Sequence, residues 1–365
     1  MMKTTGILAL AAAAAALLAG CRRPAGDLLT INLPELSGAE LQTAWTLDGA
    51  ARVEECFELA PDRPLDFVWM AGFDGKRLLF NAGDSIFLAG PGGKILSAFS
   101  RKGNGPQEYL RINSPFFDPE GRVLVLDRMT RKALTYQPDG TFVSAETEID
   151  YMDVHFFPDG SRVVLAWPDF TKESSRTFSV LGPDGTVRSS GPEKSTRELM
   201  MSIQPGRMIA AADGSCWFRY AELDTLYHIR PEGTRAVLAL VRPSKSEGSV
   251  QYNADGSVLL QQDRSRFFDR SCEVLGNLMF YSFIDTERRE DHYLVYDLRS
   301  GAILYHGEEA PLLHLDGWGV HAWPSYVHGR DAWCQLTRDD AEALLPGYND
   351  DSNSAYLHIV SRSDS

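Results

Sequence analysis

The sequence has few cysteines and no run of basic residues, and both shortages limit what the protein can be. Its 365 residues include 36 Lys and Arg against 50 Asp and Glu, so the formal net charge is −14. Because binding to nucleic-acid phosphates needs a basic surface, this balance argues against a nucleic-acid partner. The five cysteines form no CxxC pair, so we expect no structural zinc site; those in the body of the chain are expected to be free thiols, with one disulfide as the alternative.

Short catalytic and metal-binding motifs are also missing. The sequence contains no G-x-S-x-G segment and no H-E-x-x-H or H-x-H pattern, although it has eight histidines. Such patterns bring a nucleophile or several metal ligands together locally, so the local signals for a hydrolase or a metal centre are absent. We therefore predict no catalytic residue, no metal ligand and no cofactor from motifs.

The first twenty-one residues have the features of a lipoprotein export signal. Lys3 precedes an apolar run over Ile7–Leu18, which is shorter than the roughly 20 residues of a membrane-spanning helix. The run ends in Leu-Ala-Gly-Cys21, which resembles the lipobox of bacterial lipoproteins, where the cysteine receives a diacylglycerol and becomes the new N-terminus. The alternative is an ordinary signal peptide with a cysteine near its cleavage site. The expected parts are a signal peptide over 1–20, a lipidated tether over 21–45 and a folded domain over 46–365.

A lipidated Cys21 would hold the folded domain at a membrane, because two or more acyl chains anchor a protein stably. The next residues, Arg22 and Arg23, are basic, whereas an acidic cluster there would resemble the surface-export signal of some lipoproteins. We therefore expect a protein of the cell envelope that is attached to a membrane through its lipid. The anchor is expected in the outer membrane, with the protein facing the periplasm.

Asp-Gly, Glu-Gly and related dipeptides recur along the folded domain between short runs of β-branched and aromatic residues. They supply the positive φ that tight hairpin turns need. One set precedes strongly apolar strands: Gly75, Gly121, Gly160 and Gly214. A second set precedes weaker, more polar strands: Gly93, Gly140, Gly185, Gly233 and Gly301. Within each set the steps run from 39 to 54 residues, apart from the longer step from Gly233 to Gly301. This period predicts an all-β fold, a six-bladed β-propeller of four-stranded antiparallel blades.

The two ends of the folded domain are predicted to meet in the last blade. Only three strands are visible there, at Ala322–Val327, Ala332–Leu336 and Tyr356–Val360. We expect Val53–Leu59 to supply the fourth strand and close the ring, which hides the edges of an open array. Residues 244–270 fit no blade cleanly; we favour an insertion with a short helix over a hairpin of the fifth blade.

Several segments together resemble the six-bladed β-propeller lipoproteins of Bacteroidetes, which are similar to TolB and NHL propellers. Arg101–Tyr109 resembles that family's G-x-G-P-G-E-Y loop, with Gln107 in place of a glycine. Asp224–Tyr227 is similar to its D-T-[IL]-Y strand, and His292–Asp297 and Asp351–Val360 match in place. The resemblance implies the fold and an envelope location, and little about function, because propellers host both enzymes and binding proteins.

Two groups of residues are candidates for ligand binding. The aromatic cluster near the last blade would place planar rings at the channel mouth, where they could stack on a sugar or a peptide, although core packing is the favoured alternative. The loop between the first two blades offers positive charge beside a turn, and a solvated basic pair is the favoured alternative there. The candidate residues are Arg101, Lys102, Tyr109, Trp318, His321, Trp323 and Tyr326.

These features favour a non-enzymatic, membrane-anchored propeller that binds a saccharide ligand or a protein partner in the cell envelope. The first alternative is a channel-site enzyme, a hydrolase or lyase that acts on a carbohydrate or lactone. The second is a purely structural member of an envelope complex.

Replacement of Cys21 by Ala should remove the lipid anchor. We expect the variant to leave the membrane fraction of the expressing cell, whereas the wild-type chain stays there until detergent is added. Fractionation followed by immunoblotting measures the change, and mass spectrometry of the wild-type N-terminus should show an acylated Cys21. A variant that remains bound to membranes as firmly as the wild type would contradict the anchor.

Overall fold

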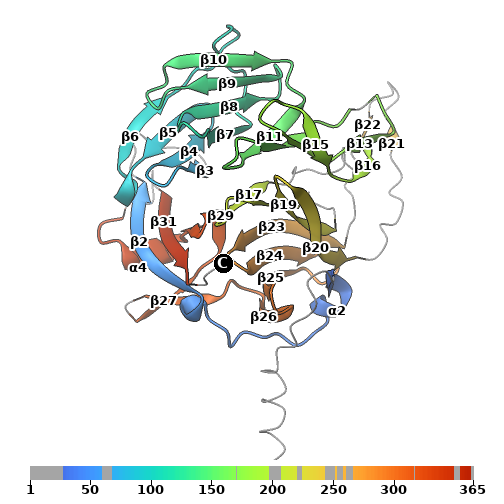
Figure 1. Cartoon of the computed structure of the whole chain (residues 1–365). Helices are drawn as coiled ribbons and strands as arrows, with labels where there is room; N and C mark the ends of the chain where they lie inside the picture. Colours follow the sequence, from blue (N-terminus) through green and yellow to red (C-terminus); the bar gives the residue numbers. More distant parts are fainter. Residues whose placement is uncertain are drawn as a thin grey trace, which may run out of the picture.

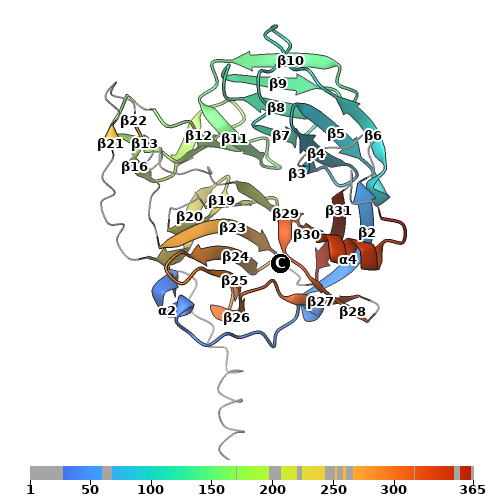
Figure 2. The same ribbon diagram turned by 180° about the vertical axis from the view of Figure 1, so that it is seen from behind.

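The computed structural model describes residues 28–59, 68–169, 171–196, 207–219, 224–242, 251–252, 258–259, 266–315, 317–348 and 354–362. Its strands form six antiparallel blades of four strands each, and these blades surround a common centre (Figures 1 and 2). Four of the blades are separate sheets, and the other two belong to one nine-stranded sheet that also includes one further strand. The predicted all-β, six-bladed propeller is therefore confirmed. Residues 1–27, with the predicted signal peptide and Cys21, lie outside the described residues.

The first three blades follow one another along the chain, and in each the first strand lies innermost. Blade 1 contains β3 (Val68–Phe73), β4 (Leu78–Ala82), β5 (Ser85–Ala89) and β6 (Ile95–Phe99). Blade 2 contains β7 (Ser114–Phe117), β8 (Val123–Asp127), β9 (Lys132–Tyr136) and β10 (Phe142–Thr147). Blade 3 contains β11 (Tyr151–Phe156), β12 (Arg162–Ala166), β14 (Phe178–Leu181) and β15 (Val187–Ser190).

The other three blades complete the ring. Blade 4 contains β17 (Met208–Ala211), β18 (Cys216–Phe218), β19 (Thr225–Arg230) and β20 (Gly233–Val241). Blade 5 contains β23 (Phe267–Leu275), β24 (Leu278–Asp285), β25 (Glu290–Asp297) and β26 (Ala302–Gly307). Blade 6 contains β29 (Pro324–Gly329), β30 (Asp331–Gln335), β31 (Ser354–Ser361) and β2 (Ala51–Leu59).

The position of a strand in its blade explains why some strands are strongly apolar and others are more polar. The strongly apolar strands are second in their blades and are covered on both faces, so every residue of β8 is buried. The weaker strands are outermost, and most of β10 is exposed. The glycines that open the strong strands, Gly75, Gly121, Gly160 and Gly214, all have positive φ, as the turn pattern predicts.

The ring is closed by the two ends of the chain, as predicted. β2 pairs antiparallel with β31 over its whole length, from Ala51 opposite Ser361 to Leu59 opposite Ser354. Phe57 stacks on Tyr356 with ring centroids 5.8 Å apart. Blade 6 thereby gains its fourth strand, because each end of the chain supplies the partner that the other lacks.

The N-terminal segment differs from the predicted tether. β1 (Leu29–Asn32) adds to blade 4 as a fifth strand, parallel to β20, and α2 (Leu33–Ser37) follows it directly. Leu29, Ile31 and Leu33 are buried, and the hydroxyl of Ser37 donates to Asp285 of blade 5 at 2.6 Å. The tether predicted over 21–45 is therefore too long, because apolar side chains at alternate positions pack this segment against the outer edge of blade 4.

Smaller elements lie between the blades. β13 (Ser174–Arg176) pairs with β16 (Glu193–Ser195), and β27 (Leu312–Leu315) pairs with β28 (Trp318–His321). Within residues 244–270, the described part contains β21 (Gln251–Tyr252), which pairs antiparallel with β22 (Val258–Leu259), and blade 5 already begins at Phe267. α4 (Arg338–Leu344) and two 3-10 turns, Leu47–Gly49 and Pro91–Gly93, complete the described elements.

Two further findings concern the cysteines and the membrane. The four cysteines among the described residues are free, as predicted: Cys56, Cys216, Cys272 and Cys334. In the described part of the chain, no helix combines the length and the apolar character that crossing a membrane requires.

Truncation of Phe57 to Ala should weaken the closure of the ring. Phe57 is 3% exposed, whereas Phe268, the matched control, is 38% exposed. We expect Phe57→Ala to lower the free energy of unfolding by about 3–5 kcal/mol and Phe268→Ala by less than about 1 kcal/mol. Denaturant unfolding of both variants measures the difference, and equal losses would show that closure does not depend on this contact.

Candidate functional site

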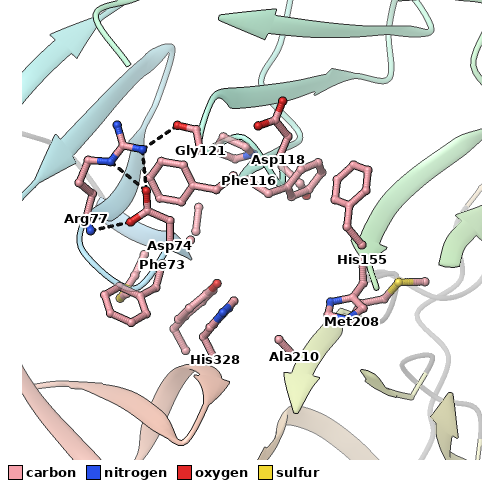
Figure 3. A pocket seen from close by; sticks show the side chains of 18 of the residues that line it. Phe73, Asp74, Arg77, Phe116, Asp118, Gly121, His155, Met208, Ala210 and His328 are labelled. Atoms are coloured by element: carbon pink, nitrogen blue, oxygen red, sulfur yellow. Dashed lines mark hydrogen bonds and ion pairs between the residues drawn. The ribbon is translucent and has the colours of Figure 1, made fainter. Parts of the chain in front are cut away.

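The centre of the propeller is asymmetric because two innermost strands pair with each other. β17 of blade 4 and β29 of blade 6 form a short parallel pairing, with Ala210 opposite His328 and Ala211 opposite Gly329. A cavity of about 1200 Å³ lies beside this pairing, lined by residues of β3, β7, β11, β17 and β29 (Figure 3). Blade 5 contributes no residue to the lining.

Aromatic side chains from four blades form much of the cavity wall: Trp69, Phe73, Phe116, Phe117, Phe156, Phe157 and Tyr326. Trp69 stands out because its side chain is 66% exposed, although its neighbours Val68 and Met70 in β3 are buried. A large ring left open in a concave site offers a surface for stacking.

An arginine joins blades 1 and 2 at one side of the cavity (Figure 3). The guanidinium of Arg77 donates to Asp74 Oδ2 at 2.6 Å and to the carbonyl of Gly121 at 2.7 Å. It also lies over the ring of Phe117, 5.1 Å from the centroid. The positive charge of Arg77 is therefore already engaged within the protein.

Two histidines line the cavity from opposite sides, His155 on β11 and His328 on β29 (Figure 3). Burial lowers the pKa of both imidazoles, that of His155 to about 4. Both are therefore neutral at neutral pH. Nε2 of His155 lies 3.2 Å from the carbonyl of Gly214, so this nitrogen carries the proton and Nδ1 is left as an acceptor.

A buried carboxyl group ties blade 3 to blade 4. Asp153 accepts hydrogen bonds from the backbone N–H groups of Val154 at 2.8 Å and Met208 at 3.1 Å. Burial nevertheless raises the pKa of Asp153 to about 6, because the loss of hydration outweighs both hydrogen bonds and the charge of Arg207.

Arg207 ties blade 4 to blades 5 and 6. Its Nη2 donates to both carboxylate oxygens of Glu273 at 2.8 Å, and its guanidinium lies over the ring of Tyr326, 4.7 Å from the centroid. Burial raises the pKa of Glu273 to about 7 despite this pairing. Arg207 and Asp153 together fix the positions of the strands that line this part of the cavity.

The comparison with known families agrees with this architecture. A family model described as "6-bladed beta-propeller" matches residues 75–303, which is more than half of the chain. The chain belongs to this family. The predicted propeller family is thereby confirmed, while no curated protein matches the chain.

Solved structures show the same fold at low sequence identity. A Bacteroides fragilis protein described as exported is 13% identical, and the alignment covers 92% of this chain and 100% of that chain with a TM-score of 0.63. A Bacteroides vulgatus protein is 10% identical over 86% of this chain and 98% of its own, with a TM-score of 0.50. Virginiamycin B lyase from Staphylococcus aureus is 11% identical over 85% and 99%, with a TM-score of 0.40. For the two Bacteroides proteins, whose TM-scores are 0.63 and 0.50, the likeness concerns the fold alone.

The predicted basic loop lies away from the cavity and holds blade 1 to blade 2. The buried Tyr109 donates from its hydroxyl to the carbonyl of Asp84 at 2.9 Å, and Lys102 forms an ion pair with the Asp84 carboxylate. Arg101 donates to the carbonyl of Gly140 at 3.0 Å. None of the three predicted residues lines the cavity.

The predicted aromatic cluster is divided by the structure, and of its four residues only Tyr326 lines the cavity. Trp318 is 48% exposed on the β27–β28 hairpin, where His321 approaches the carbonyl of Ala310 at 2.7 Å. Trp323 packs edge-on against Phe280 and Tyr293, which is the core packing that was weighed as the alternative.

Trp69 was not among the predicted site residues. It lies in Phe67–Phe73, an apolar run typical of a buried strand. The only sequence feature that could have identified it is its place before the first blade turn, where the innermost strand of a blade is expected. Among the described residues, no group of three or more His, Cys, Asp or Glu side chains is placed to hold a metal ion.

The raised pKa of Asp153 predicts a pH-dependent stability. The folded state holds this proton more tightly than the unfolded state, whose carboxyl titrates near 3.8, so stability falls as pH rises from about 4 to about 6. Across that pH range the free energy of unfolding of Asp153→Asn should fall less than that of the wild type. The difference is about 1.4 kcal/mol for each pH unit by which the pKa of Asp153 is raised on folding.

Urea unfolding at several values between pH 4.5 and pH 7.5 measures this slope. Asp159→Asn provides the matched control: hydrogen bonds from Ser161 lower the pKa of the exposed Asp159, so this carboxylate stays ionised throughout that pH range and its removal should leave the slope of stability against pH unchanged. If Asp153→Asn and the wild type lose stability in parallel, Asp153 does not carry a raised pKa.

Proposed function

We propose that the protein is a lipid-anchored propeller of the bacterial cell envelope, held in the outer membrane facing the periplasm, and that it binds a ligand in its central cavity without converting it. The lipobox at Cys21 supports the anchor, and the cavity beside the β17–β29 pairing supports the binding. The observation that carries the proposal is the exposed Trp69 in the cavity wall.

The size and lining of the cavity suit a ligand of substantial size. Ligand pockets commonly enclose about 300–1,000 Å³ and combine apolar walls with a few polar groups. This cavity holds about 1200 Å³ and combines aromatic rings with His155, His328 and Asn81. Covering the exposed part of Trp69 would contribute on the order of 3 kcal/mol to binding.

The walls are fixed before a ligand arrives. Asp153 joins β11 to β17, Arg207 joins β17 to blade 5, and Arg77 joins blade 1 to blade 2. A site whose side chains are already ordered loses little conformational entropy on binding, so more of the contact energy remains as affinity. This supports a binding role for the cavity.

A channel-site hydrolase or lyase for a carbohydrate or lactone is the second candidate. One observation favours it: Asp153 lines the cavity and has a pKa of about 6, as a general acid would. Both Asp153 oxygens already accept backbone N–H groups, which suits a structural bridge better than proton transfer to a ligand. Incubation with candidate saccharides and analysis for cleavage products separates the two functions.

Trp69→Ala should abolish most of the ligand affinity. Thermal-shift screening of the detergent-solubilised chain against oligosaccharides, oligopeptides, nucleosides and lactones should reveal a class that stabilises the wild type. We expect Trp69→Ala to weaken that binding at least tenfold, because the stacking surface is lost.

Trp318→Ala is the matched control, since Trp318 is also an exposed tryptophan but lies outside the cavity. It should bind as the wild type does. If no class binds, or if Trp318→Ala loses the affinity and Trp69→Ala keeps it, the central cavity is not the site.

A further inference from the structure

We propose that the ligand of the central cavity is a neutral saccharide, stacked on Trp69 and held by uncharged hydrogen-bonding groups. This inference rests on the proposed binding function of the cavity and names the class of its ligand. It follows from which lining groups are already engaged within the protein and which are left open.

Most of the charged side chains that line the cavity form ion pairs with other residues of the protein. Seven lining residues carry charge: Asp74, Lys76, Arg77, Asp118, Glu120, Asp153 and Arg207. Arg77 pairs with Asp74, and Arg122 pairs with both Asp118 and Glu120. Arg207 pairs with Glu273.

The two remaining charged residues offer a ligand little. Asp153 is half-buried, and its carboxyl group accepts two backbone hydrogen bonds. Lys76 is exposed on the turn that follows β3. An ion pair with this solvated lysine would contribute little to binding, because exposed pairs are weak. Apart from Lys76, a charged ligand would have to break an existing ion pair or remain without a partner, and either outcome opposes its binding.

The groups left open are uncharged. The imidazole ring of His328 has no hydrogen-bond partner among the described residues, and its lowered pKa keeps the ring neutral, with one donor and one acceptor. Asn81 is half-buried and also lines the cavity. Within that same part of the chain its Oδ1 has no partner and is itself buried, so it meets a ligand only when the amide turns toward the cavity. A sugar hydroxyl both donates and accepts, so it matches an imidazole or an amide equally well.

Asn81 lies directly beside the stacking surface. In the pairing of β3 with β4, Asn81 is opposite Trp69, and both line the cavity. A sugar ring presents an apolar C–H face and a rim of hydroxyl groups, so it can stack on an indole while its rim reaches a neighbouring amide. The Trp69–Asn81 pair therefore combines both modes of saccharide recognition.

The test uses hexasaccharides that share a backbone and differ in charge. The pairs are β-1,4-mannohexaose with its mannuronate counterpart, cellohexaose with its glucuronate counterpart, and N-acetylated chitohexaose with the deacetylated, cationic form. Calorimetry with the full chain in detergent should show that a neutral member binds at least tenfold more tightly than its charged counterpart, and that addition of salt leaves this binding unchanged.

Asn81→Leu tests the amide without removing the strand. Because the buried oxygen of Asn81 has no partner, we expect this variant to unfold at the same temperature as the wild type or higher. Its affinity for the neutral hexasaccharide should fall at least fivefold. A variant that is destabilised and still binds normally would show that Asn81 serves only the fold.

The outcomes separate this inference from the proposed function. Preferential binding of a charged member, or Trp69-dependent binding of a peptide with no saccharide binding, would overturn the neutral saccharide and keep the cavity as a binding site. If neither the hexasaccharides nor the broader compound classes bind, the inference and the proposed function fail together.

Discussion

The pairing of β17 with β29 determines where this propeller can hold a ligand. The innermost strand of each blade has one edge toward the centre, and its backbone groups on that edge need partners. Blades 4 and 6 satisfy part of this need through Ala210 opposite His328 and Ala211 opposite Gly329. Because these two strands meet, blade 5 is cut off from the cavity, and the open space lies among the other five blades.

Other inner edges are satisfied in different ways. The carboxylate of Asp153 accepts the N–H of Met208 next to the β17–β29 pairing. In β7, Pro115 has no N–H that could be left without a partner. The backbone groups at the centre are thus hydrogen-bonded only in part. Among the described residues the inner edges of β3, β7 and β11 pair with no further strand, and residues of these strands line the cavity.

The same contacts that hold the blades together also determine the electrostatic character of the site. Arg77 and Arg207 each connect one blade to another through a carboxylate or a carbonyl. Their charges are consequently unavailable to a ligand, although the chain as a whole has a net charge of −14. What remains at the cavity wall is aromatic and neutral, chiefly Trp69, Asn81 and His328.

Turn spacing in the chain was enough to assign the blades, because a hairpin is made by neighbouring residues and a glycine such as Gly121 reports its own φ. The closure of the ring by Val53–Leu59 also followed from the sequence, since a blade with three strands needs a fourth. The buried positions of Leu29 and Ile31 did not, because their partner β20 lies more than 200 residues away. The composition of the site was likewise decided only by the tertiary structure: Trp69 and Trp323 look alike as apolar strand residues, and what separates them is which blade lies opposite each ring.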